Sequence, residues 1–138
     1  MNNNYQRIVY FVATLIFLLS VEISIATAES IMPYADEVFD SASISLTTNK
    51  NADFQALTAT TCSEIKVTAV VLQKRNSSGI WVNSKILTPP SDVWRNGKVY
   101  DATKDYSSVI GTGTFRLKAT FSADDHSITR YSNVRTYS

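Results

Sequence analysis

The chain has few of the residues that build disulfides, metal centres and catalytic dyads. Its 138 residues include one cysteine and one histidine. A single cysteine cannot form a disulfide within the chain, and one cysteine with one histidine cannot supply a zinc site of the finger or ribbon type. Neither sign of charge dominates, since 13 Lys and Arg stand against 12 Asp and Glu. A formal charge of +1 excludes the strong field that attracts nucleic acid or an anionic membrane.

The first 28 residues have the order of a secretory signal peptide. Residues 1–7 are polar with one basic side chain, residues 8–19 are almost wholly apolar, and Ala-Thr-Ala at 26–28 is a small-x-small cleavage signal. The alternative is a transmembrane anchor, which needs about 20 apolar residues, and Glu22 interrupts the run before that length. We therefore expect cleavage after residue 28 and a secreted protein of about 110 residues, the size of one domain, without a membrane anchor.

The mature chain is patterned as strands throughout. It is rich in β-branched, hydroxyl and aromatic residues in short alternations, and no stretch keeps a 3.6-residue apolar period over three turns. The pattern predicts a loose lead-in at 29–40 and then one β-domain at 41–138. Its seven strands are expected at residues 42–48, 54–60, 64–75, 81–87, 98–106, 114–122 and 128–137.

The expected strand at 114–122 has the most regular alternation. Its apolar residues, which we expect to face the core, are Phe115, Leu117, Ala119 and Phe121. The strand at 64–75 is less regular, because its apolar residues change parity between residues 67 and 70. A β-bulge near residues 68–69 would turn both halves of that strand inward.

Seven short strands in about 100 residues predict a two-sheet sandwich, with a small barrel as the alternative. Phe115-x-Leu117-x-Ala119, followed by Ser132 and Thr136, resembles the F–G region of fibronectin type III and related immunoglobulin-like domains. The residues 71–75, with Gly79 and Trp81 after them, are similar to the C–C′ hairpin of those domains. The resemblance implies an immunoglobulin-like antiparallel β-sandwich.

A broader pattern covers nearly the whole mature chain. It consists of Cys62-Ser63-x-Ile65-x-Val67, Leu72-Gln73-Lys74-Arg75, Gly79-x-Trp81, Phe115-Arg116-x-Lys118-Ala119, His126, Tyr131-Ser132-Asn133 and Tyr137. This order resembles a family of small secreted Gram-positive proteins that is itself a domain of unknown function. The resemblance implies a signal peptide and one β-domain, and it brings no activity and no catalytic or binding residues.

The chemistry available for catalysis is limited to Cys62 and His126. In the expected topology their two connections lie at the same end, so a Cys62–His126 dyad oriented by Asp124 or Asp125 is sterically possible. The simpler interpretation makes Cys62 a small, part-buried apolar residue. The two aspartates alone do not supply the 6–8 oxygens that calcium takes, and a turn with an Asx cap explains them. We expect no metal, no cofactor and no catalysis.

The connection at 88–97 is the longest and is stiffened by two prolines. It contains Trp94 and Arg95, two residue types enriched at binding hot spots. In the expected topology it shares an end with Cys62 and His126. Trp94 can therefore either plug the open end of the core or form a platform for a partner.

These features together predict a secreted, non-catalytic module with a binding or structural role outside the cell. Its partner is expected to be an extracellular protein or a glycan and not nucleic acid. The candidate binding residues are Trp94, Arg95, Asp124, Asp125 and His126. The alternative functions are a secreted effector or inhibitor and a Cys–His hydrolase.

Overall fold

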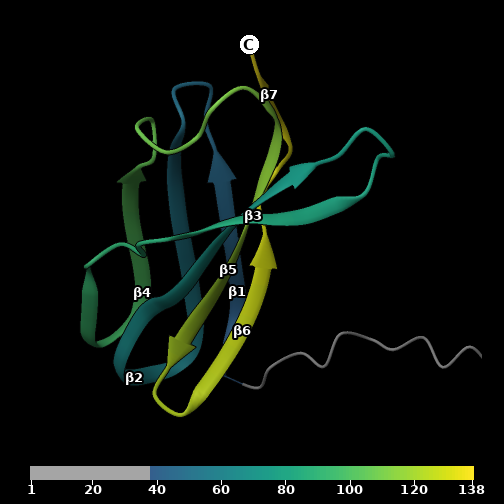
Figure 1. The fold of residues 1–138 in the computed structure, drawn as a ribbon. Coiled ribbons are helices and arrows are strands. Elements are labelled where there is room, and N and C mark those ends of the chain that lie inside the picture. The colour runs from purple at the N-terminus through teal and green to yellow at the C-terminus, as the bar shows by residue number, and fades with distance from the viewer. Residues whose placement is uncertain (1–37) are drawn as a thin grey trace, which may run out of the picture. The chain divides into compact units, whose positions relative to one another are not determined.

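The structure, a computed structural model, describes residues 38–138, so the predicted signal peptide and nearly all of the predicted lead-in lie outside the described residues. The described part folds into seven strands, all paired antiparallel (Figure 1). They are β1 (Phe39–Leu46), β2 (Asn51–Arg75), β3 (Trp81–Leu87), β4 (Val93–Asp105), β5 (Gly113–Ala123), β6 (His126–Tyr131) and β7 (Arg135–Tyr137). The prediction of an all-β antiparallel domain of about seven strands is confirmed. Residues 38–138 include no helix that could cross a membrane.

Strand β2 is 25 residues long and organises the whole sheet. Its first part pairs with β1 on one edge and β4 on the other, and its last part pairs with β5 and β3. The seven strands therefore form one sheet that curls around β2 into a half-barrel (Figure 1). The prediction of separate strands at 54–60 and 64–75 is wrong. Instead, β2 continues through this region, shifts its register against β4 between Leu57 and Cys62, and pairs with β4 again from Cys62 onward.

Three other predicted boundaries also differ from the structure. β1 begins at Phe39, within the predicted lead-in, and β4 begins at Val93, within the predicted 88–97 connection. The predicted strand at 128–137 is two strands, β6 and β7, which both pair with β5. In each case pairing with a neighbouring strand extends or divides an element beyond what its local composition indicates.

The core lies between the two halves of the curled sheet. Phe115, Leu117, Ala119 and Phe121 are all buried, which confirms the predicted inward face of β5. The Phe121 ring meets the edges of Phe54 in β2 and Tyr100 in β4, with centroids 6.4 and 6.3 Å apart. The predicted bulge is also confirmed, because the β2–β5 register shifts between Val67 and Ala69.

Side chains close the edge of the sheet next to β1. The Asn133 side chain accepts a hydrogen bond from the Leu46 backbone N–H at 2.7 Å and donates to the Leu46 carbonyl at 3.0 Å. The Arg135 Nε donates to the same carbonyl, and the Tyr137 hydroxyl donates to the Thr47 carbonyl at 2.7 Å. These bonds satisfy backbone groups that a neighbouring strand would otherwise pair.

The segment at 88–92 crosses from β3 to β4 on the open side of the half-barrel (Figure 1). Two buried tyrosines hold it: the Tyr106 hydroxyl donates to the Thr88 carbonyl at 2.8 Å, and the Tyr100 hydroxyl donates to the Asp92 carbonyl at 3.3 Å. Burial raises the pKa of Tyr100 to about 12, and burial also raises the pKa of Tyr106. Both hydroxyls therefore keep their protons, and remain donors, well into the alkaline range.

Candidate functional site

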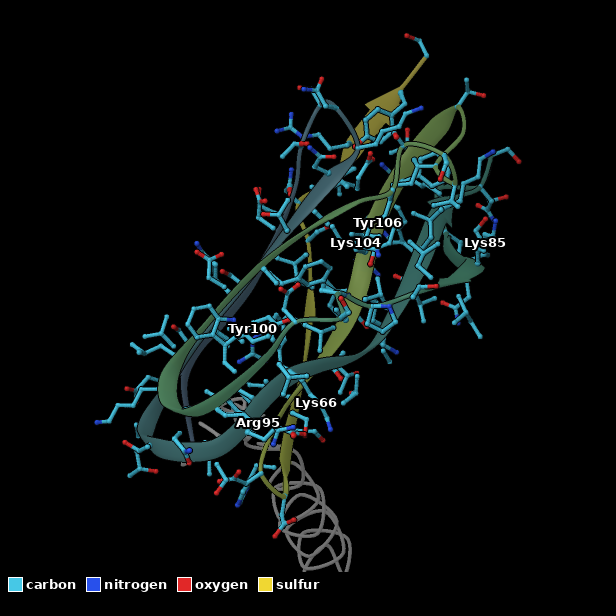
Figure 2. The ribbon with its side chains drawn as sticks, turned by 90° about the vertical axis from the view of Figure 1, so that its left-hand side faces the viewer. Lys66, Lys85, Arg95, Tyr100, Lys104 and Tyr106 are labelled. Carbon is cyan, nitrogen blue, oxygen red and sulfur yellow. The ribbon has the colours of Figure 1, made fainter. Side chains whose placement is uncertain are left out.

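The predicted binding residues meet at the bend of β2. Trp94 pairs with Ile65 and Arg95 pairs with Glu64, while Ala123, at the end of β5, pairs with Ile65 from the other edge. Figure 2 shows Arg95 and Lys66 near each other at this end of the domain. The structure thus brings the three predicted segments together, although Trp94 and Arg95 stand on a paired strand and not on a loop.

Asp124 acts as a clamp between the β5–β6 hairpin and β2. Its carboxylate accepts hydrogen bonds from the backbone N–H groups of Ser63 at 3.2 Å and Glu64 at 3.0 Å, and its own N–H donates to the Glu64 carbonyl. Its positive φ of 49° is a conformation that aspartate tolerates better than most residues.

The neighbouring Asp125 and His126 are exposed. Within residues 38–138, no three His, Cys, Asp or Glu side chains lie close enough to hold a metal ion.

The charged side chains around the bend are paired with each other. Glu64 forms an ion pair with Lys66 and another with Arg95, whose Nη2 lies 3.1 Å from Oε2 of Glu64. The hydrogen bond from Lys66, together with the nearby Arg95 charge, lowers the pKa of Glu64 below its ordinary value. Glu64 is therefore an ordinary ionised carboxylate at neutral pH and not a candidate general acid.

Trp94 is exposed and does not plug the core. Its exposed fraction is 46%, and that of its neighbour Val93 is 42%. The buried residue of the 88–97 segment is Pro90, which lies between Thr88 and Asp92, the two residues bonded to the tyrosine hydroxyls. Of the two roles that the sequence left open for Trp94, the plug is therefore wrong.

Cys62 is buried, as predicted for a small apolar residue in this position. Its exposed fraction is 3%, and its thiol donates a long, weak bond to the Thr60 carbonyl at 3.6 Å. Nucleophilic cysteines are found in partly exposed, electropositive surroundings, whereas buried ones are inert. The position of Cys62 thus favours a structural role.

A second, partly exposed cluster, which sequence reasoning missed, lies on the outer face of β3, β5 and β6. The guanidinium of Arg116 stacks between two rings, 4.6 Å from the centroid of Trp81 and 4.3 Å from that of Tyr131. We refer to Trp81, Arg116 and Tyr131 as the stacked cluster. Alternation along β5 predicts that Arg116 points outward, but the contact with Trp81 depends on the register of β3, β2 and β5, which the sequence does not reveal.

A groove of about 370 Å³ lies where the ends of β3 and β4 approach each other. Its lining includes Lys85, Lys104, Tyr106 and Val109, and it contains none of the predicted binding residues. In Figure 2, Lys104 and Tyr106 lie next to each other, and Lys85 lies farther out at the same end of the domain. The lining of the groove is mixed, because Ile86, Leu87 and Val109 stand beside the two lysines.

Comparison of the chain with protein-family models, curated proteins and solved structures found no match. Its function must therefore be inferred from the exposure and contacts of its own residues. Two exposed aromatic surfaces stand out in the described part of the chain, namely Trp94 with its charged neighbours and the stacked cluster. Both stand on paired strands, whose ordered backbone is suited to contact with another molecule.

Proposed function

We propose that the mature protein is a secreted, non-catalytic module that binds an extracellular protein through its Trp94 end. The contact surface consists of Trp94, Arg95, Asp124, Asp125 and His126. The observation that carries the proposal is the exposure of Trp94, an indole nearly half open to solvent on a paired strand. A large aromatic side chain displayed in this way is typical of a binding hot spot.

The backbone around Trp94 is held before any partner arrives. β4 is paired with β2 on both sides of this residue, and the Asp124 clamp holds the neighbouring hairpin against β2. A surface that is already ordered loses little conformational entropy when it binds. Arg95 adjoins Trp94 along β4 and forms an ion pair with Glu64 of β2, so charges of both signs lie near Trp94 in the strand pair, as in the mixed polar rim of a protein interface.

We infer an immunoglobulin-like sandwich connectivity for the curled sheet. The support is that β1 and β4 flank the first part of β2, whereas β3 and β5 flank its last part. Each half thus corresponds to one sheet of such a sandwich, and the ring contacts of Phe121 cross between them. In this interpretation the usual loop between the second and third strands is replaced by the continuous β2.

We infer secretion from the signal-like order of residues 1–28. The polar start, the apolar run and the small residues at 26 and 28 are the features that direct export and cleavage. N-terminal sequencing of protein recovered from the culture medium is expected to begin at Glu29. Recovery of an intact Met1 in the membrane fraction would contradict the inference.

Replacing Trp94 with alanine is expected to abolish partner capture while changing the free energy of unfolding by less than about 1 kcal/mol, as is usual for surface changes. The tagged mature domain is immobilised and incubated with a surface extract of the producing cells, and bound protein is quantified beside urea melts. Val99→Ala is the matched control, because Val99 is on the same strand and is 54% exposed. A stable Trp94→Ala variant with full capture would eliminate this end as the binding site.

A further inference from the structure

Charge is unevenly distributed between the two halves of the domain although the chain is nearly neutral. Residues 66–75 of β2 contain three Lys or Arg residues, β5 contains two such residues, and β3, β6 and β7 each contain one. None of these segments contains Asp or Glu. The acidic strand residues all lie in β1, the first part of β2 and β4, namely Asp40, Asp53, Glu64, Asp101 and Asp105. The strands of one half of the sheet therefore carry only basic charges, which the net charge conceals.

The outward residues of this cationic half form a continuous face across four strands. Arg116 in β5 is opposite Gln73 in β2, which in turn is opposite Asn83 in β3. On the other edge of β5, Lys118 is opposite Tyr131 in β6. Residues opposite each other in an antiparallel pair share a face, so these side chains and the stacked cluster form one surface, which we call the β5 outer face.

A buried glutamine fixes the position of Arg116 on the β5 outer face. Gln73 is only 8% exposed, and its carbonyl accepts a hydrogen bond from the Arg116 Nε at 2.8 Å. Its amide nitrogen donates to the Asn83 Oδ1 at 2.9 Å. Two rings and a satisfied polar network hold the guanidinium in place, so its orientation is set before a ligand binds.

Arg116 retains binding capacity after these contacts. A guanidinium has five N–H donors in a planar fork, and the bond to Gln73 uses the one on Nε. The two Nη groups can bind a carboxylate in a bidentate arrangement. Lys118 provides a second cation two residues along the strand, and 49% of Tyr131 is exposed.

Hydroxyl groups continue the same face along β5. Thr120 and Thr129 lie opposite each other with their hydroxyl oxygens 3.1 Å apart, and Thr114 and Thr136 are similarly placed at 2.9 Å. The face thus combines cations, aromatic rings and hydroxyls within one rigid layer. Carboxylated sugars present the complementary groups, namely carboxylates, pyranose rings with apolar faces, and hydroxyls.

We propose that the β5 outer face binds an acidic polysaccharide whose sugar units carry carboxylates. Arg116 and Lys118 bind the carboxylates, the exposed aromatic surface of Tyr131 packs against a sugar ring, and the threonine hydroxyls bond to sugar hydroxyls. Nucleic acid fits less well, because tight binding to phosphates needs many unpaired cations, and Lys66 on this half is already paired with Glu64. The site is separate from the Trp94 end and does not depend on the function proposed for it.

Oligosaccharides of alginate, which are composed entirely of uronates, test the proposal directly. Their affinity for the mature domain is measured by titration calorimetry beside neutral dextran, oligo-dT and poly-glutamate. We expect saturable binding of the oligouronate that weakens with salt, no binding of dextran, and at least tenfold weaker binding of the other two polyanions. Equal affinity for oligo-dT or poly-glutamate, or no binding of the oligouronate, would overturn the proposal.

Arg116→Lys is the decisive variant, because it keeps the charge and loses the planar fork. We expect it to bind the oligouronate at least tenfold more weakly than the natural protein does. Arg130→Lys is the matched control, since Arg130 is opposite the buried Ala119 and so lies on the other side of β6 from Tyr131. Lys118→Gln, which leaves the Arg116–Gln73 bond intact, is expected to weaken binding several-fold and reduce its salt dependence. Unchanged affinity in both Arg116→Lys and Lys118→Gln would exclude this face.

Discussion

Replacing Phe121 with alanine is expected to lower the free energy of unfolding by about 3–5 kcal/mol. Phe121 is fully buried, and its ring contacts Phe54 and Tyr100 from the opposite half of the sheet. The substitution removes buried apolar surface and leaves a cavity that rigid strands cannot fill. A domain of this size has only about 5–15 kcal/mol of stability, so the shift in the urea midpoint will be large.

The contact between Phe121 and Phe54 can be separated from simple burial by a double-mutant cycle. We expect the losses from Phe121→Ala and Phe54→Ala to be non-additive by about 0.5–3 kcal/mol, because each ring packs on the other. Additivity within about 0.5 kcal/mol would mean that the first part of β2 does not face β5. That result would contradict the curled arrangement of the sheet.

Replacing Leu117 with alanine is expected to cost about 2–5 kcal/mol, again from lost transfer energy and a cavity. Leu117 is fully buried at the middle of β5, and its neighbours along the strand point outward. Thr114→Ala and Thr120→Ala are the matched controls on the outward face, and each should cost less than about 1 kcal/mol. The reverse ranking of urea midpoints would show that the inward register of β5 is off by one residue.

The local sequence pattern was sufficient to predict the buried face of a strand wherever apolar and polar residues alternate along it. The alternation at 114–122 correctly identified the buried side of β5, and the parity change near residues 68–69 correctly located the β2 bulge. The strand expected at 81–87 coincides with β3. Side chains alternate strictly along a strand, so burial leaves a readable period-two pattern in the sequence.

Pairing between distant segments could not be predicted in this way. Residues 61–63 were expected to separate two strands, yet β2 continues through them because β4 pairs with it on both sides of the register shift. The closure of the β1 edge depends on Asn133, which is 87 positions from Leu46 and has no local pattern that reveals its partner. Hydrogen bonds of this kind are determined by the register of neighbouring strands and not by propensity.

For the candidate binding surfaces too, the sequence predicted some features and only the tertiary structure decided others. The residue types Trp94 and Arg95 in a stiff segment indicated a binding surface, but only the folded structure shows that the indole is exposed. Asp124 was correctly placed near β2 by topology, whereas its role as a backbone clamp follows only from its bonds to Ser63 and Glu64.

The sequence by itself determined the strand class, the inward face of β5, the β2 bulge and the absence of a disulfide, because each depends on composition or on a period-two pattern. Tertiary structure alone decided the continuity of β2, the exposure of Trp94 and the stacking of Arg116 between Trp81 and Tyr131. These features depend on which strands become neighbours and in which register. A shift of one residue reverses the face on which every side chain of a strand lies, so only the folded sheet defines them.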